Sequence, residues 1–526
     1  MRTPKISKAY YSLTHWHDFR LKIFGEGIFI GFIVGFIIVA FRYLLEQAEM
    51  LRSVIYHYLQ TGHWALAILW FLALFGIAYL LNWIVKIEPM SSGSGIPQVK
   101  GIILGFMKMN WLKVLLTKFI GGVLAIGAGL SLGREGPSIQ LGATVGQGIS
   151  RSLGRSKMEE RYLLTSGASA GLAAAFNAPL AGVIFSLEEL HKNFSPTVLM
   201  SAVAAALTAV LVSQQFFGYN PVFNFVGLPI LPINYYGLII ALGILMGLLG
   251  IAFNRFLIKS LEIYEQQTLL SGMWKIALPL VFAGIIGFFL PEVLGGGNNL
   301  VDELATKSFS LNMLWLLLLG KFFFTMISFG SGAPGGIFLP MLVIGALAGS
   351  VFSHILIHFG QLDPYYSTNI IVLSMAAYFS AVVKAPITGS ILIMEMTGSF
   401  QHMFSLIIVS MAAYLVTDIA KIKPIYEELL ERSLNKQGKL SVNITTKKKI
   451  IIDVTIGIGS KLDGKQIKNI TWPPNCLLVS IKRGDTELVP KGNTRIVIGD
   501  YLYVLTTVDQ AKKIRELAEE CEPQLP

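Results

Sequence analysis

Three short segments of the chain combine glycine and proline with very few charges. They are Gly93-Ser94-Gly95-Ile96-Pro97, Gly133-Arg134-Glu135-Gly136-Pro137 and the longer run from Gly330 to Pro340. Glycine opens the backbone and proline suits a first helical turn, so each segment predicts the start of a helix. A helix N-terminus carries free N–H groups and partial positive charge. The predicted chemistry is weak binding of an anion by backbone N–H groups and a hydroxyl.

The elements that hold these segments must lie in an apolar environment. The chain has 526 residues, of which 53% are hydrophobic and 14% are charged, and its mean hydropathy is +0.63. Soluble domains carry about 25% charged residues. The composition excludes a soluble enzyme, a disordered hub and a nucleic-acid binder as the main identity. It predicts a polytopic membrane protein with ten to twelve apolar segments, many of them broken by Gly or Pro.

Two blocks of the sequence recur in order at nearly the same offset. At an offset of 203 the recurring residues are Lys118 and Lys321, Gly133 and Gly336, and Pro137 and Pro340. At an offset of 207 they are Ala178–Gly182 and Ala385–Gly389, followed by Glu188 and Glu395. The membrane part is therefore predicted to consist of two related halves. Paired halves with broken segments at matching positions are typical of a transporter site.

The density of charge changes near residue 439. Residues 439–526 hold 24 Lys, Arg, Asp and Glu side chains, about 27%, against about 11% in the rest of the chain. The expected divisions are an N-terminal segment (1–24), a membrane domain (25–435), a linker (436–448) and a soluble domain (449–526). Basic residues dominate the first segment, in which we recognise no signal peptide, and they predict a cytoplasmic N-terminus.

The motifs resemble those of the CLC family of chloride channels and transporters. GSGIP at 93–97, GREGP at 133–137 and GIFLP at 336–340 look like its three signatures, and LAAAFNAPLAG at 172–182 accompanies them. The resemblance implies an all-α polytopic membrane protein, with a CLC-type inverted repeat of broken, tilted helices in halves of about 25–220 and 235–435. It also implies a homodimer in the lipid bilayer, with one chloride pathway in each subunit.

The resemblance further assigns residues to chloride. Ser94 is expected to supply a hydroxyl to the central ion, and the backbone N–H groups of Ile337 and Phe338 contribute from the second half. Tyr426, in Lys423-Pro424-Ile425-Tyr426, matches the family tyrosine that caps the ion from the cytoplasmic side. Lys118 matches a family lysine beneath the site, where it either raises the positive potential or pairs with an acid.

Glu135 resembles the external gating glutamate of the family. A carboxylate can compete with an anion for the same helix N-termini, and protonation removes its charge and frees the site. One group then couples proton occupancy to anion occupancy. The alternative is a buried salt bridge between Glu135 and Arg134, because intramembrane charges often pair. Arg134 otherwise lends electrostatic support to the site.

Two adjacent acids, Glu188 and Glu189, follow the apolar run 163–187. Adjacent helical residues point in different directions, so the two need not share a role. Glu189 matches the family's internal proton-transfer glutamate; the alternative is a carboxylate at a cytoplasmic helix end, where His191 and Lys192 follow. The recurrence of Glu188 as Glu395 favours a structural, interhelical role for that pair.

The family contains both chloride/proton antiporters and passive channels. Glu135 is compatible with both, whereas Glu189 gives protons an inner route and favours coupled H⁺/Cl⁻ exchange; a gated chloride channel is the alternative. Serine in GSGIP implies chloride over nitrate, and the pattern of the fluoride-exporting branch is absent. The sequence has no nucleotide-binding GxxxxGK[ST], no TVGYG-like filter and no HExxH. We expect no enzyme activity, catalytic residue, cofactor or metal site.

The C-terminal part predicts a small cytosolic α+β domain. Strands are expected at 450–452, 476–481 and 501–505, and a helix at 510–520. Residues 473–506 resemble the TrkA-C (RCK-C) module of bacterial ion transporters. That resemblance implies a small effector, a cyclic dinucleotide or another nucleotide; stabilisation of the dimer is the alternative role. It also favours a prokaryotic protein in the cell membrane, with both termini cytoplasmic. Lys447–Lys449 fits a solvated linker or a lipid contact, and no nucleic-acid partner is expected.

Overall fold

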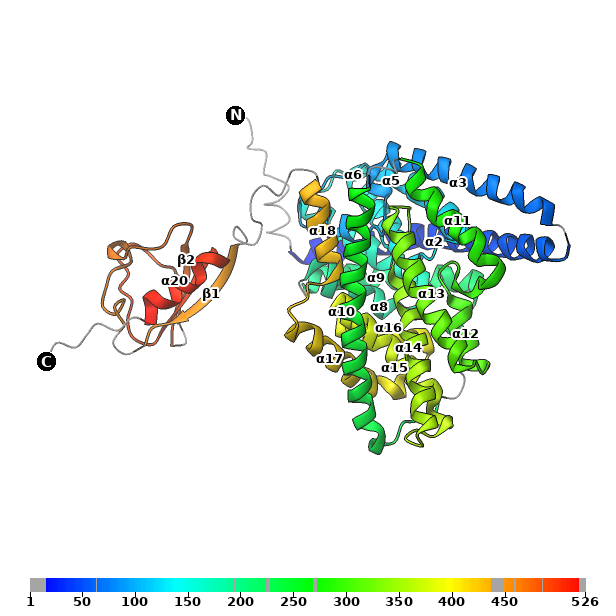
Figure 1. Ribbon diagram of the computed structural model, residues 1–526. Helices are drawn as coiled ribbons and strands as arrows, with labels where there is room; N and C mark the ends of the chain where they lie inside the picture. The colour runs from blue at the N-terminus through cyan, green and yellow to red at the C-terminus, as the bar shows by residue number, and fades with distance from the viewer. Residues whose placement is uncertain are drawn as a thin grey trace, which may run out of the picture. The chain divides into compact units, whose positions relative to one another are not determined.

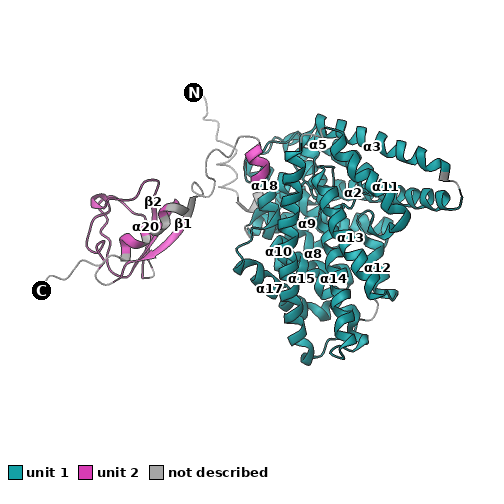
Figure 2. Ribbon diagram, in the orientation of Figure 1, with its two compact units in different colours: residues 1–430 teal, residues 431–526 magenta. Residues whose placement is uncertain are grey.

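The computed structural model describes residues 16–519 except 63, 193–194, 224, 226–227, 268–271, 437–448, 458–459 and 485. The chain divides into two compact units, 1–430 and 431–526 (Figure 2). The first helix begins at Trp16, so part of the segment 1–24 belongs to it. The predicted linker lies outside the described residues, apart from its first residue, Lys436, which ends α18.

The first unit contains two successive sets of eight α-helices among the described residues (Figure 1). The first set is α2 (Trp16–Gln60), α3 (Ala67–Ile87), α4 (Ile96–Ile103), α5 (Trp111–Gly127), α6 (Glu135–Ser152), α7 (Lys157–Phe176), α8 (Pro179–Phe185) and α9 (Pro196–Phe217). The second set is α10 (Tyr236–Gln266), α11 (Trp274–Phe289), α12 (Asn298–Thr306), α13 (Leu311–Gly330), α14 (Phe338–His358), α15 (Ser367–Val383), α16 (Pro386–Thr397) and α17 (Met403–Ile419). A π-helical turn, Ser186–His191, extends α8, and α18 (Ile425–Lys436) follows the second set.

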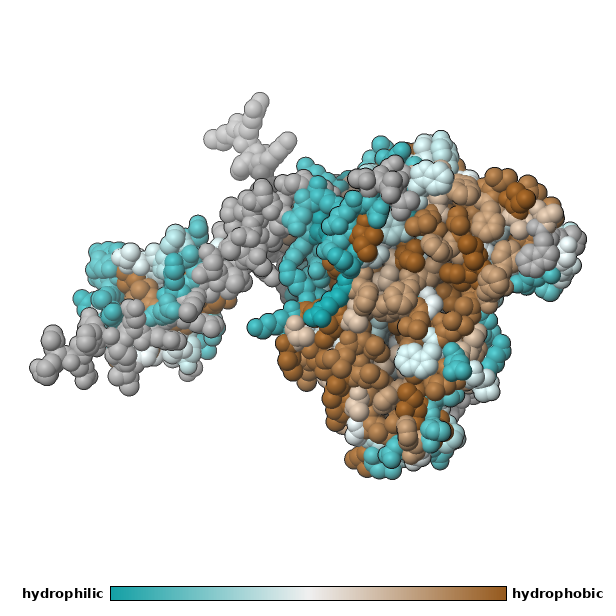
Figure 3. Space-filling model, viewed as in Figure 1, coloured by the Kyte–Doolittle hydropathy of each residue, from teal (hydrophilic) through white to brown (hydrophobic). Residues whose placement is uncertain are grey.

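These helices are those of a membrane protein. Eight of the described helices are long and apolar enough to cross a bilayer. Figure 3 shows apolar residues covering the visible flank of this unit, with hydrophilic residues gathered towards its ends. Figure 1 shows α2 and α3 strongly inclined to α10. The short helices α4, α8 and α12 are too short to span a bilayer, which confirms the expected broken and tilted helices.

The two sets of helices are joined at equivalent positions. Gly133 and Gly336 form an antiparallel bridge in which each N–H donates to the other's carbonyl, at N···O distances of 2.7 and 2.8 Å. Gly93 N–H donates to the Gly332 carbonyl, and Gly295 N–H donates to the Gly129 carbonyl. Reciprocal bonds between matching residues require two segments that run in opposite directions about a twofold axis. The hydrogen bonds between matching residues of the two halves therefore agree with the predicted inverted repeat.

Two buried lysines hold the glycine loops of the repeat. Lys118 Nζ donates to the carbonyls of Ser91 and Gly93 at 2.9 and 2.5 Å. Lys321 Nζ donates in the same way to Val293 and Gly295, at 2.9 and 2.7 Å. Within the described chain neither lysine forms an ion pair with an acid, so the structure does not support the alternative in which Lys118 pairs with an acid. Its ammonium group instead fixes the loop that carries Ser94.

Two carboxylates interlock the halves. Glu188 accepts from the N–H of Thr388 at 2.8 Å, in the first turn of α16. Glu395 of α16 accepts from the N–H groups of Leu180 and Ala181, at 3.1 and 2.7 Å, in the first turn of α8. Each half thus supplies the carboxylate that satisfies free N–H groups at a helix start in the other half. The interhelical role predicted for this pair is confirmed.

The second unit is a small sheet with one long helix. Strands β1 (Lys449–Thr455), β2 (Leu477–Arg483), β3 (Thr486–Leu488) and β4 (Asp500–Thr507) form an antiparallel sheet in the order β1-β4-β2-β3. Helix α20 (Val508–Glu519) contributes Ile514 and Ala518 to the core beneath the sheet. The three predicted strands and the helix are confirmed, whereas β3 was missed because only three residues form it.

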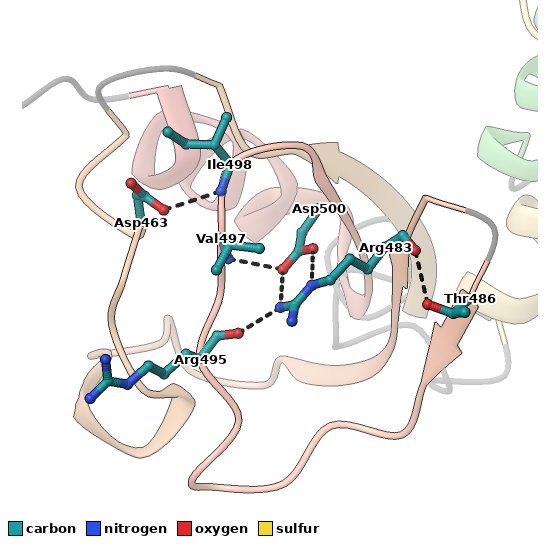
Figure 4. Close-up of polar contacts among 7 residues, drawn as sticks. All are labelled: Asp463, Arg483, Thr486, Arg495, Val497, Ile498 and Asp500. Atoms are coloured by element: carbon teal, nitrogen blue, oxygen red, sulfur yellow. Dashed lines mark hydrogen bonds and ion pairs between the residues drawn. The ribbon is translucent and has the colours of Figure 1, made fainter.

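An ion pair closes the loop between β3 and β4. Arg483 donates from Nε and Nη2 to the two carboxylate oxygens of Asp500, both at 2.8 Å, and Asp500 also accepts from the Val497 N–H (Figure 4). Burial alone would raise the pKa of Asp500, but the hydrogen bonds from Arg483 and Val497 outweigh it and hold the pKa below its usual value. The Asp500 carboxylate is therefore a structural anchor of this unit.

Candidate anion and proton site

Three helix N-termini meet where the sequence predicts an anion site. Helix α6 begins at Glu135 and α14 at Phe338, directly after the Gly133–Gly336 bridge. Helix α4 begins at Ile96, after Gly95 in the left-handed conformation at φ +97°. A Cβ atom at Gly136 would lie 2.5 Å from Ser94 Oγ, so only glycine lets the loop before α4 approach α6 this closely. The first turns of three helices thus share one small region.

Two predicted chloride ligands have buried hydroxyls without a partner. Ser94 Oγ and Tyr426 Oη are buried and make no hydrogen bond within the described chain. Native proteins rarely leave buried hydroxyls unsatisfied, so such groups indicate a place for a ligand. The N–H groups of Ile337 and Phe338 lie at the start of α14, where helix geometry leaves donors unpaired. All four predicted ligands therefore present donors without a helical partner.

The Glu135 carboxylate lies beside the start of α14. It is fully buried, and its two oxygens make no hydrogen bond of standard geometry within the described residues. A Cβ atom at Gly133 would lie 2.3 Å from Glu135 Oε2 and 3.0 Å from the Leu339 nitrogen, so the carboxylate and that backbone nitrogen are neighbours. The carboxylate therefore lies against a helix N-terminus that would also attract an anion.

Arg134 does not form the salt bridge that would compete with this role. Its Nη1 lies 3.8 Å from the Glu46 carboxylate of α2, which is the ion pair of Arg134 among the described residues. Arg134 remains close enough to Glu135 for a favourable electrostatic interaction. The alternative of a buried Arg134–Glu135 salt bridge is therefore not supported by the geometry.

Glu189 lies in a different environment from Glu135. It is buried in the π-helical turn after α8, and its Oε1 lies 2.7 Å from Lys100 Nζ of α4. Lys100 lies 3.8 Å from Glu427 of α18, and Glu427 also pairs with Lys192. Glu189 thus lies at a helix end near Lys192, as in the alternative reading, and its direct partner is Lys100. Its role in proton transfer stays a prediction.

Sequence reasoning missed Lys100 and Glu427. Lys100 ends the run Gly93-Ser94-Gly95-Ile96-Pro97-Gln98-Val99-Lys100, and a single charge in an apolar segment is a signal in itself. Glu427 directly follows the predicted ligand Tyr426. The Tyr426 hydroxyl is close enough to Glu135 and Glu189 to interact electrostatically with both. The predicted anion ligand Tyr426 is therefore near both predicted proton carriers.

Comparison with known proteins settles the family. Residues 77–418 match the family described as voltage gated chloride channel. This protein belongs to that family. Residues 451–519 match the TrkA-C domain, which is the second unit.

Relatives of this CLC protein include the H(+)/Cl(-) exchange transporter ClcA of Vibrio cholerae. It is 34% identical over 430 residues, covering 78% of this chain and 90% of the relative. The protein of the same name from Citrobacter koseri is 34% identical over 426 residues, covering 78% and 88% of the two chains. A crystal structure described as a slow cyanobacterial Cl-/H+ antiporter superimposes with a TM-score of 0.76 at 32% identity, covering 79% of this chain and 99% of that one.

Proposed function

We propose that this protein exchanges chloride for protons across the membrane. The observation that carries the proposal is the position of Glu135, a buried carboxylate at the start of α6 beside the start of α14. Relatives of similar length carry the name of H⁺/Cl⁻ exchange transporters, which supports antiport over a passive channel. A gated chloride channel remains the alternative function.

The chloride site in this proposal is built from both halves. Ser94 and Tyr426 donate their hydroxyls, and Ile337 and Phe338 donate backbone N–H groups at the start of α14. None of these donors carries a full charge, so the ion is held weakly enough to leave. Lys118 supports the site indirectly by fixing the loop of Ser94 through the Ser91 and Gly93 carbonyls.

Glu135 acts as the gate in this mechanism. When it is ionised, its carboxylate occupies the positive end of α14 and excludes chloride. When it takes up a proton, the charge is lost and chloride can replace the side chain at the helix N-termini. The same group cannot hold the proton and repel the anion at once, which couples the two ions. Glu189 exchanges protons with the opposite side.

The test is proton movement in proteoliposomes under a chloride gradient, with no opposing pH gradient. Uphill proton transport by the native protein that is lost in Glu135→Ala establishes coupled exchange and assigns the gate. Glu189→Gln should remove proton transport while chloride flux persists. Chloride flux without linked proton movement in the native protein would establish the channel instead.

We propose the orientation of the protein in the membrane from the distribution of its basic residues. Lys22 and Glu26 near the start of α2 pair with Glu159 and Arg155 at the turn between α6 and α7. That turn is rich in Lys and Arg, which marks the cytoplasmic side of a membrane protein. These contacts support the proposal that the N-terminus lies in the cytoplasm, and we propose the same side for the C-terminus, in a prokaryotic cell. Labelling of single cysteines introduced at this turn, in intact cells and in inverted vesicles, tests the assignment.

The assembly and its regulation complete the proposal. The protein acts as a homodimer, and its TrkA-C domain binds a small effector, a cyclic dinucleotide or another nucleotide, that biases transport. Calorimetry of the full-length protein with cyclic di-AMP and with ATP tests binding. Mass measurement of the detergent-solubilised protein tests the dimer. Stabilisation of the dimer without effector binding is the alternative role of the domain.

A further inference from the structure

Lys100 is buried between two carboxylates. Its Nζ lies 2.7 Å from Glu189 Oε1 and 3.8 Å from Glu427 Oε1. The side chains of Lys100 and Glu189 are 2% and 3% exposed, whereas that of Glu427 is 34% exposed. The ammonium group thus forms a short ion pair with the buried acid and lies within reach of a second acid that contacts solvent.

The same two helices carry the anion ligands. Lys100 lies on α4, which begins directly after Ser94-Gly95, and Glu427 follows Tyr426 in the first turn of α18. Glu427 also pairs with Lys192, whose side chain is 42% exposed. The ion pairs therefore run from solvent, through Glu427 and Lys100, to Glu189.

A proton cannot bind Glu189 without a change in this arrangement. An ammonium group in contact with a buried carboxylate favours the ionised form of the acid. A buried ammonium group left without a partner is costly, by several kcal/mol in general. When Glu189 takes up a proton, Lys100 needs another carboxylate, and Glu427 lies close enough to receive it.

We propose that Lys100 is a positioning residue for proton uptake: it bonds to Glu189 while that acid is ionised and moves to Glu427 when Glu189 is protonated. In this step the Lys100–Glu189 hydrogen bond breaks, a hydronium ion from the solvent gives its proton to the Glu189 carboxylate and leaves as water, and the Lys100–Glu427 contact shortens. The O–H bond of the hydronium ion that breaks is replaced by the new O–H bond of Glu189. The inference rests on the proposed exchange of chloride for protons.

The charged groups that face Glu189 determine in which direction each variant should shift the pH midpoint of proton transport. Lys100 faces it from α4, Glu427 and the Tyr426 hydroxyl from α18, and Lys192 from the end of its own turn. His191, on the same turn, packs against Tyr162 of α7. Replacing one of these charged residues therefore changes the electrostatic potential at Glu189 in a known direction.

The test is the pH profile of chloride-driven proton transport in proteoliposomes. Lys100→Met removes the positive partner of Glu189, so the pH midpoint of proton transport should move up by about one unit or more. Glu427→Gln removes the second acceptor and binds Lys100 more firmly to Glu189, so the midpoint should move down. Midpoints that stay unchanged, or that move in the same direction in both variants, overturn the proposal.

Control variants separate this role from a structural one. Lys384→Met breaks a different lysine–carboxylate pair, also of 2.7 Å, between Lys384 at the end of α15 and Asp418 of α17, and should leave the midpoint in place. If Lys100→Met alone folds poorly and loses chloride flux, the double variant Lys100→Met/Glu189→Gln, which removes both members of the ion pair, should recover that flux. If neither of these variants folds, the shift of the pH midpoint in Glu427→Gln alone tests the proposal. Absence of proton transport in the native protein would reject the exchange function itself, which is a separate result.

Discussion

The two halves of the membrane unit share a scaffold but differ in their chemistry. Lys118 and Lys321 bond to matching loops, and Gly95 and Gly297 adopt the same left-handed conformation, with φ of +97° and +95°. At the helix starts the halves diverge. Helix α6 begins with Glu135, whereas α14 begins with Phe338, 203 residues later.

This difference separates structural residues from functional ones. Polar groups that recur in both halves, such as the two loop lysines and the pair Glu188 and Glu395, satisfy backbone groups. The polar side chains of Ser94, Glu135 and Glu189 in the proposed site, by contrast, have no polar counterpart in the other half. Ser94 corresponds to Gly296 in the matched loop, and Glu189 corresponds to Met396 at the offset of 207. These residues of the proposed site therefore lie at positions where the two halves differ in sequence.

The largest expected effect comes from the two bridging glycines. A Cβ atom at Gly133 would lie 2.3 Å from Glu135 Oε2, whereas one at Gly336 would have no neighbour closer than 3.2 Å. Gly133→Ala should displace the gate at a cost of about 1–3 kcal/mol, which corresponds to a loss of about 5-fold to 150-fold in coupled transport. Gly336→Ala should cause a much smaller loss of coupled transport. Equal losses in proteoliposome flux would contradict the functional difference between the halves.

The two loop lysines provide the next test. Lys118→Met and Lys321→Met should each destabilise the protein by about 1–3 kcal/mol, because two backbone carbonyls lose their donor. Thermal unfolding in detergent should report similar losses for both. Only Lys118→Met should also weaken chloride binding in calorimetry, since only its loop carries Ser94. A similar loss of chloride affinity in Lys321→Met would show that the second loop also belongs to the site.

The interlocking carboxylates should behave symmetrically. Glu188→Gln and Glu395→Gln keep an acceptor but remove the charge at a helix start, which should cost about 1 kcal/mol each. Thermal unfolding measures that loss. The ratio of protons to chloride should stay unchanged in both variants. A changed ratio in either variant would place that residue among the functional ones.

The smallest effect is expected in the C-terminal unit, which has no counterpart in either half. The pKa of Asp500 is held below its unfolded value, so its contribution to stability is present above about pH 4 and is lost as pH falls through the lower folded value. The protection of the β4 amides against hydrogen exchange in the full-length protein, measured relative to the intrinsic exchange rate at each pH, should therefore fall on acidification. Asp500→Asn should remove most of this pH dependence, whereas Asp463→Asn, which keeps an oxygen acceptor for the Ile498 N–H, should retain it. Chloride flux should be unchanged in both.

The sequence predicted the features that are written in periodicity and composition. The repeat, the three helix starts and the fold of the C-terminal unit follow from Gly, Pro and apolar patterns, and the structure has them. The partners of charged residues could not be predicted in this way. Lys118 binds carbonyls, Arg134 pairs with Glu46 on α2, and Glu189 pairs with Lys100. These contacts depend on how distant helices pack, which no local pattern encodes.

The carboxylates Glu188 and Glu395 also have a consequence for biosynthesis. The acceptor of the Ala181 N–H lies 214 residues further along the chain, so it is synthesised later. At roughly 5–20 residues per second of synthesis, the first half spends on the order of ten to forty seconds in the membrane before Glu395 exists. During that interval the start of α8 lacks its final acceptor and needs water or a chaperone. Premature termination between the halves would therefore leave a product in which the N–H groups of Leu180 and Ala181 lack their carboxylate acceptor.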